Sequence, residues 1–68
     1  MKISNIHTGD IVKLKDELLQ YEANKRWIGV RGEVKRVCGY YAYVNWNAPW
    51  PIKDEVEEPI DFLQKVYE

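Results

Sequence analysis

The segment from residue 27 to residue 46 constrains the fold most, because it carries the alternation of a β-hairpin. Along Tyr40–Trp46 every second side chain is apolar, and these side chains belong to Ala42, Val44 and Trp46. Successive residues of a strand point to opposite faces of the sheet, so these three residues predict one inner face. The remaining side chains then point to solvent, and they belong to Tyr41, Tyr43 and Asn45.

The first strand of this hairpin, residues 30–34, must present its small and apolar residues to the same interior. We predict that a three-residue loop, Val37–Gly39, joins the two strands, with Gly39 in the left-handed conformation. The pairs that follow are Val34 with Ala42, Gly32 with Val44, and Val30 with Trp46. A two-residue Cys38-Gly39 turn would pair Val34 with Tyr43 and turn the apolar sets to opposite faces, so we reject it.

The flanking segments predict the remaining elements of an all-β fold, which we assign to a single domain of residues 1–68. A turn at Thr8-Gly9-Asp10 precedes a half-buried strand at Ile11–Lys15. Asp16–Lys25 contains helix formers and no β-branched residue, and we favour an irregular arm over a short helical turn. Pro59–Leu63 suits one helical turn, because proline is tolerated at a first helical position. A last strand at Gln64–Tyr67 would then lie beside the first.

Four short segments follow one another in the order and spacing of a known small fold: Gly9–Leu14, Gly29–Val34, Tyr43–Trp46 and Pro59–Leu63. The chain thereby resembles the SH3-like small barrels, in the branch that includes KOW domains and the small stromal subunits of photosynthetic electron-transfer complexes. The resemblance implies a five-stranded, strongly bent SH3-like barrel with a one-turn 3-10 segment before the last strand. It also puts Gly32 in the position of the KOW glycine. It does not extend to Pro-rich peptide binding, because the 3-10 turn carries Ile60 and Phe62 and no tyrosine.

The outer face of the hairpin is the candidate partner-binding surface. Together with one loop residue, its members are Arg31, Lys35, Tyr41, Tyr43, Asn45 and Trp50. Tyrosine and arginine are common anchors of interfaces, so these residues predict binding of a partner protein. The alternative is ordinary cross-strand pairing of tyrosine with lysine on a solvated sheet. Trp50 lies between two prolines, and we favour its folding back over the core rather than awaiting a partner.

Charge is polarised along the chain. Residues 25–36 hold five cations and one anion, which gives +4, and residues 53–61 hold one cation and five anions, which gives −4. The five cations could instead form a KOW-like site for RNA or DNA, and they are Lys25, Arg26, Arg31, Lys35 and Arg36. If the basic and acidic segments are adjacent they neutralise each other, which we favour. The net charge of −1 gives no molecule-wide attraction to phosphates.

Catalysis, metal binding and cofactor binding have little basis in this composition. One cysteine, Cys38, and one histidine, His7, cannot build a structural zinc site, and Ser4 is the only serine. The acidic run 54–58 lacks the spacing of a calcium loop, so we interpret it as solvated surface. We therefore expect no enzyme activity, no cofactor and no metal. Cysteine usage and the lack of a long apolar stretch favour a cytoplasmic protein that does not bind membranes, and the oligomeric state stays open.

Overall fold

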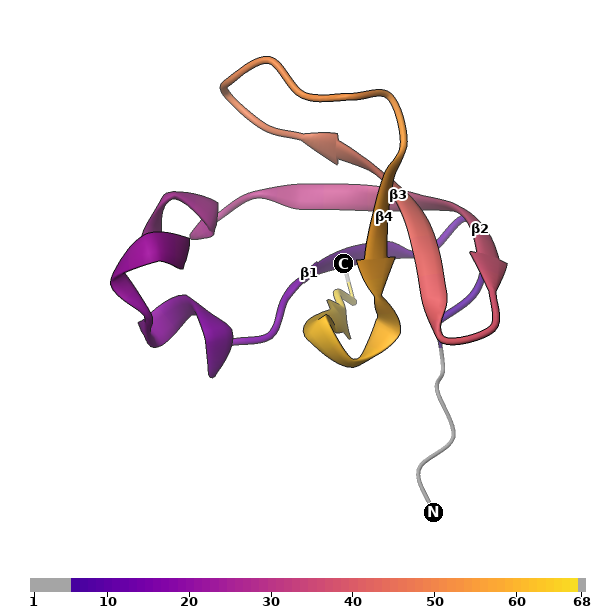
Figure 1. Cartoon of the computed structure of the whole chain (residues 1–68), viewed down its shortest axis with the longest axis horizontal. Helices are drawn as coiled ribbons and strands as arrows, with labels where there is room; N and C mark the ends of the chain where they lie inside the picture. Colours follow the sequence, from indigo (N-terminus) through magenta and orange to yellow (C-terminus); the bar gives the residue numbers. More distant parts are fainter. Residues whose placement is uncertain (1–5, 68) are drawn as a thin grey trace.

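The computed structural model describes residues 6–67, which form strands joined by short turns and 3-10 helices. In chain order the elements are β1 (Ile11–Leu14), η1 (Leu18–Gln20), η2 (Glu22–Trp27), β2 (Arg31–Cys38), β3 (Tyr41–Asn47), β4 (Val56–Pro59), η3 (Ile60–Phe62) and β5 (Leu63–Lys65). Every strand pair is antiparallel. The predicted all-β class is therefore confirmed (Figure 1).

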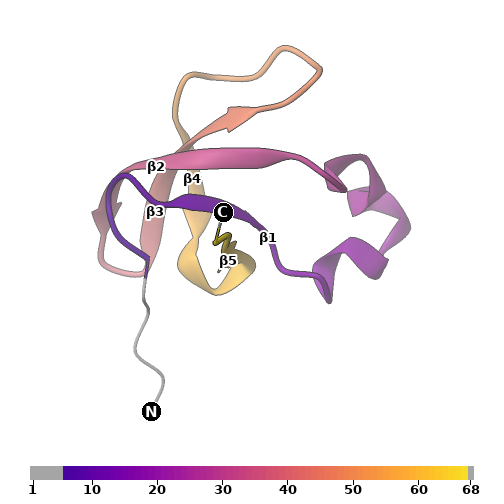
Figure 2. The same cartoon turned by 180° about the vertical axis from the view of Figure 1, so that it is seen from behind.

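The strands form one five-stranded sheet in the order β4-β3-β2-β1-β5. β5 pairs with β1, as predicted for the last strand, with Leu63 opposite Leu14, although β5 begins one residue earlier than expected and ends at Lys65. Within the described residues 6–67, β4 and β5 are edge strands that do not pair with each other, so the sheet is not closed. Figures 1 and 2 show the segment between β1 and β2, which holds η1 and η2, at one end of the molecule and the β2-β3 turn at the other.

The predicted hairpin faces are correct, but the predicted register is wrong by two residues. Val34 pairs with Val44, and Gly32 pairs with Trp46. The loop has two residues, Gly39 and Tyr40, and Gly39 has a φ of +60° at its first position, as type II′ turns require. A shift by two leaves the same side chains inside, since the side-chain period of a strand is two.

A β-bulge makes the two-residue turn compatible with these faces. The register shifts between Val34 and Arg36, so Lys35 is an extra residue on β2. Beyond it Arg36 pairs with Tyr43, and Val37 pairs with Ala42. A bulge bends its strand and increases the local twist, and Figure 1 shows β2 turning near its end. Alternation along the sequence does not reveal this turn, because the bulge interrupts the ladder between Val34 and Arg36.

The core is a single cluster on the inner face of the sheet. Its buried hydrophobic residues are Ile6, Val12, Leu14, Val30, Val34, Ala42, Val44, Trp46 and Leu63. Every residue predicted to face inward from the hairpin is buried, Gly32 included. The Trp46 ring occupies the space that a side chain at position 32 would fill, because a Cβ there would lie 2.7 Å from Trp46 Cε3. The absence of a side chain at Gly32 thus allows the Trp46 ring, the largest in the core, to pack over β2.

The segment between β1 and β2, which we call the arm, contains ordered 3-10 turns rather than the irregular chain that we favoured. The N–H of Leu18 donates to Lys15 O, and the N–H of Asn24 donates to Tyr21 O. The Asn24 Nδ2 group also donates to Leu18 O at 3.0 Å, which ties η2 to η1. A side-chain amide that bonds a backbone carbonyl is typical of local turn structure. The arm is therefore held by its own hydrogen bonds.

The acidic run also differs from the prediction, because part of it forms strand β4. Val56 pairs with Val44, and Glu57 pairs with Tyr43. Proline is tolerated on edge strands, which agrees with the edge position of a strand that ends at Pro59. The alternation of Val56 and Glu58 with Glu57 was too short and too charged to predict a strand.

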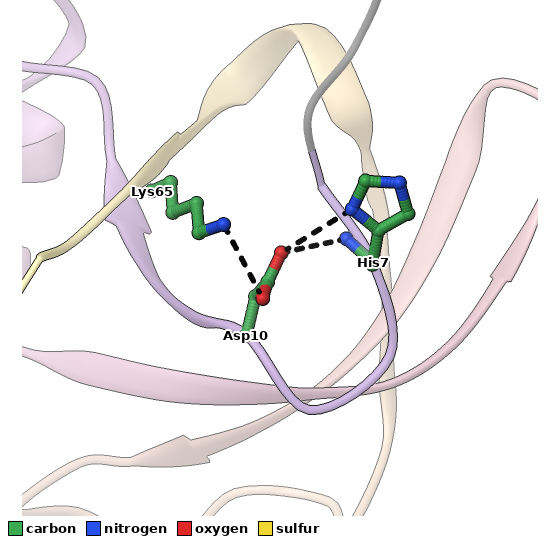
Figure 3. Close-up of polar contacts among 3 residues, drawn as sticks. All are labelled: His7, Asp10 and Lys65. Carbon is green, nitrogen blue, oxygen red and sulfur yellow. Dashed lines mark hydrogen bonds and ion pairs between the residues drawn. The ribbon is translucent and has the colours of Figure 1, made fainter.

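Asp10 joins the first turn of the described chain to the last strand (Figure 3). Its Oδ2 atom accepts a hydrogen bond from the backbone N–H of His7 at 2.8 Å, and the His7 Nδ1 atom lies 3.8 Å away. Its Oδ1 atom lies 3.6 Å from Lys65 Nζ. The predicted turn at Thr8-Gly9-Asp10 is confirmed. The contacts of Asp10 hold this turn next to β5.

Candidate functional site

The outer face of the β2-β3 hairpin carries several of the predicted partner-binding residues. Residues that pair directly across antiparallel strands share a face, and the outward pairs are Arg31 with Asn47, Glu33 with Asn45, Arg36 with Tyr43, and Cys38 with Tyr41. Lys35 is the bulge residue, and its Nζ atom lies 3.5 Å from Glu33 Oε1. Arg31 and Asn45 line a wide, shallow hollow of about 540 Å³, away from the turn. The predicted set is therefore spread along the face.

Tyr43 has partners on both neighbouring strands. The Arg36 guanidinium carbon lies 4.2 Å from the centre of its ring, and its hydroxyl donates to Glu57 Oε2 at 3.3 Å. The Glu57 carboxylate raises the pKa of the Tyr43 phenol, with burial and the hydrogen bond adding to the rise, whereas Arg36 lowers it. The Arg36 Nε atom also lies 3.5 Å from Glu55 Oε1. Tyr43 is thus part of a cross-strand polar cluster.

The end of the hairpin holds apolar side chains in water. Val37, Tyr40 and Tyr41 are 40%, 87% and 45% exposed. The backbone there is fixed, because the N–H of Ile60 donates to Tyr40 O at 2.8 Å. We call Arg36, Tyr40, Tyr41 and Tyr43 the hairpin surface. Val37 pairs with the buried Ala42, so its side chain belongs to the opposite face. The sequence predicts Tyr40 as the first residue of the second strand and in no site, whereas it occupies the second position of the turn.

Trp50 does not join the hairpin surface. Its ring meets Trp27 edge to face, with centroids 5.0 Å apart, and Trp27 meets Trp46 in the same way at 5.1 Å. The Arg26 guanidinium carbon lies 4.5 Å from the centre of the Trp50 ring. Trp50 therefore folds back over the core, which is the alternative that we favoured, and Trp27 links the two other indoles.

Acidic or aromatic partners lie beside most of the basic residues proposed for nucleic acid. Lys25 Nζ lies 3.7 Å from Glu22 Oε1. As described above, Lys35 contacts Glu33 and Arg36 contacts Glu55. Arg26 lies over the Trp50 ring. Exposed ion pairs contribute little to stability, but each carboxylate cancels local positive charge. The Arg36–Glu55 contact also brings the basic and acidic segments together, as we favoured.

A groove between the arm and η3 was not predicted. It encloses about 380 Å³, and its lining residues are Leu14, Leu18, Tyr21, Asn24, Trp27, Glu58 and Phe62. We call it the arm groove. Its walls come from residues 14–27 and 58–62, which are at least 31 positions apart in the sequence, so no local motif reveals it. Two rings on it are exposed, with Tyr21 at 64% and Phe62 at 44%.

Glu58 is the acidic member of the arm groove. It pairs with Ala42 on β3, which turns its side chain to the inner face of the sheet. Its Oε2 atom accepts a hydrogen bond from Trp46 Nε1 at 3.1 Å. Burial raises the pKa of the Glu58 carboxyl above its ordinary value, and the Trp46 bond offsets part of the rise. The groove therefore holds a carboxylate that has lost part of its water.

Comparison with protein families found no match, and comparisons with curated proteins and with solved structures found no significant match. Among residues 6–67, no helix has the length and apolar character needed to cross a bilayer. The candidate sites therefore depend on the geometry of the chain itself.

Proposed function

We propose that the chain is a non-enzymatic protein-interaction module, an accessory or regulatory subunit that binds a partner protein through the hairpin surface. The observation that carries this proposal is the exposure of Tyr40 and Tyr41, two successive tyrosines at one end of the sheet. Tyrosines with large exposed areas lose little conformational entropy on binding, which makes them effective interface anchors. The Tyr40 carbonyl is already hydrogen-bonded to Ile60, so the surface is largely ordered before binding.

The architecture proposed for this module is an SH3-like barrel of the KOW type. Three features support it: the strongly bent β2, the long arm between β1 and β2, and η3 directly before β5. The antiparallel pairing of the first strand, β1, with the last strand, β5, agrees with it. Because such barrels serve unrelated functions, the proposed role depends on the hairpin surface and not on the fold.

A protein partner fits this surface better than a nucleic acid does. Binding to a phosphate backbone requires cations that can replace counterions. Here the Arg36 guanidinium lies over Tyr43 and beside Glu55. Tyr43 itself contacts the Glu57 carboxylate, which would repel phosphate next to the ring. Apolar rings bordered by both charge signs suit the mixed chemistry of a protein surface.

The test replaces Tyr40 and Tyr41 together by serine and uses the protein as bait in an extract of its own cells, with and without nuclease. We expect the double variant to lose a partner that the wild type retains after nuclease treatment. The thermal midpoint should change little, since exposed substitutions cost within about 0.5 kcal/mol. Tyr67→Ser is the matched control, because Tyr67 is an exposed tyrosine that lies elsewhere.

Two results would contradict the proposal. Retention of the partner by the double variant would remove the hairpin surface from the interaction. Loss of the partner on nuclease treatment would show that nucleic acid carries the interaction, and the basic residues Lys25, Arg26, Arg31, Lys35 and Arg36 would then become the site to test.

A further inference from the structure

The arm groove combines aromatic walls with an apolar floor. Tyr21, Trp27 and Phe62 contribute rings, and Leu14 and Leu18 contribute aliphatic surface. Aromatic faces attract cations, and aliphatic surface covers the methylene stem of a lysine or arginine. A volume of about 380 Å³ lies near the lower end of the range for ligand pockets, about 300–1,000 Å³. The groove therefore suits one long side chain and part of its neighbour.

The charge in the groove is negative. Of the described residues that line it, Glu58 alone carries a formal charge near neutral pH. A carboxylate can accept several hydrogen bonds, and one oxygen of Glu58 accepts the Trp46 indole N–H. Two of the three cations of the arm are engaged elsewhere, with Lys25 beside Glu22 and Arg26 over Trp50. A cation from outside the chain would thus meet a complementary charge in partly dehydrated surroundings.

The walls of the groove are held in place by hydrogen bonds. The N–H of Lys15 donates to Phe62 O at 3.0 Å, which fixes η3 against the end of β1. On the opposite wall, the Asn24 side chain donates to Leu18 O at 3.0 Å. Because these walls need little ordering on binding, more of the contact energy remains as affinity.

We propose that the arm groove binds a lysine or arginine side chain presented by a partner protein, with the stem against Trp27 and Phe62 and the charge at Glu58. The site is separate from the hairpin surface, since the two share no residue. It gives the module a second point of contact with a basic segment of a partner. The proposal does not require the hairpin surface to bind.

The test uses four short peptides that differ at one position, of the form acetyl-Ala-Leu-Xaa-Ala-amide with arginine, lysine, citrulline or norleucine as Xaa. Binding is followed by tryptophan fluorescence, because Trp27 lines the groove and Trp46 donates to Glu58. We expect the arginine and lysine peptides to bind the full-length protein at least tenfold more tightly than the two uncharged ones.

Two variants locate the site. Glu58→Gln keeps an acceptor for Trp46 and should weaken the arginine and lysine peptides at least tenfold while leaving the norleucine peptide unchanged. Glu57→Gln is the matched control, because Glu57 precedes Glu58 on β4 and its side chain contacts Tyr43 on the other face of the sheet. It should leave all four affinities unchanged. The comparison among peptides on the wild type remains decisive even if a variant folds poorly.

Three results would overturn the proposal. The first is equal binding, or no binding, of the charged and uncharged peptides. The second is weakening by the Tyr40 and Tyr41 double variant but not by Glu58→Gln, which would assign the peptides to the hairpin surface. The third is a dimer in analytical ultracentrifugation that Phe62→Ser converts to monomer, which would show that a second copy of the chain covers the groove.

Discussion

Replacing Gly32 by alanine tests the packing of the core directly. A Cβ at this position would lie 2.5 Å from Val44 Cγ1 and 2.7 Å from Trp46 Cε3. Carbon atoms in contact prefer about 3.5–4.0 Å, so both neighbours must move by roughly 1 Å. Neither can do so easily, because Val44 and Trp46 are buried in the same cluster. Overpacking of this kind costs about 1–3 kcal/mol, and two clashes with buried groups favour the upper end.

The net cost is smaller than the clash alone suggests. Alanine restricts the unfolded chain more than glycine does, which stabilises the protein by about 0.4–1 kcal/mol. The expected loss is therefore about 2 kcal/mol. A chain of this length has a total stability of roughly 3–10 kcal/mol, so the loss is a large fraction of it. At about 4–8 °C per kcal/mol, circular dichroism should show a decrease in the melting temperature of roughly 8–16 °C.

A double-mutant cycle shows whether the loss comes from the clash. In a Val44→Ala background one of the two close contacts disappears, and Gly32→Ala should cost about 1 kcal/mol less than in the wild type. Gly29→Ala is the control, since Gly29 has a φ of +84° and nothing lies within 4 Å of its Cβ position. Its cost arises from backbone strain and should be the same in both backgrounds. An equal cost for Gly32→Ala in both backgrounds would refute the packing argument.

Three further predictions concern the polar and aromatic contacts. Glu57→Gln should lower the phenol pKa of Tyr43, because it removes the carboxylate that raises this pKa. Ultraviolet titration measures the phenol pKa, and an unchanged value would contradict the contact between Glu57 and Tyr43. Burial raises the pKa of the Glu58 carboxyl in the folded protein, so its ionisation costs more there than in the unfolded chain. The wild type should therefore lose stability relative to Glu58→Gln as the pH rises from about 3 to 7. Urea unfolding at several pH values checks this, and a stability difference that does not change with pH would exclude it. Trp50→Ala should cost about 2 kcal/mol and shift the fluorescence maximum to longer wavelength as Trp27 becomes exposed, whereas an unchanged spectrum would argue against the edge-to-face contact.

The inner face of the hairpin could be predicted from the sequence because burial depends on parity alone. Ala42, Val44 and Trp46 alternate without interruption, so any even shift of the partner strand preserves their side of the sheet. The register could not be predicted in the same way. It depends on Lys35 being left unpaired, and nothing in its side chain distinguishes a bulge residue from a paired one.

The two candidate sites differ in the same way, because one depends on a local pattern and the other on tertiary structure. Tyr41 and Tyr43 were found by alternation, which is a local property of β3. The arm groove was missed because Tyr21 and Phe62 meet only after the arm and η3 are both placed against β1. Glu58 was interpreted as solvated because its neighbours in sequence are acidic, whereas its neighbour across the sheet is Ala42. Local composition predicts exposure poorly at an edge strand of this kind.

The open edge at β4 has a consequence for behaviour at high concentration. An unpaired strand is a template on which another chain can extend the sheet, and proteins with long apolar edges form intermolecular aggregates in this way. β4 is only four residues long, it carries Glu57 and Glu58, and it ends at Pro59, which has no N–H to donate. Two such edges brought side by side would oppose like charges. The same short acidic segment that supplies a carboxylate to the arm groove therefore also disfavours self-assembly at this edge of the sheet.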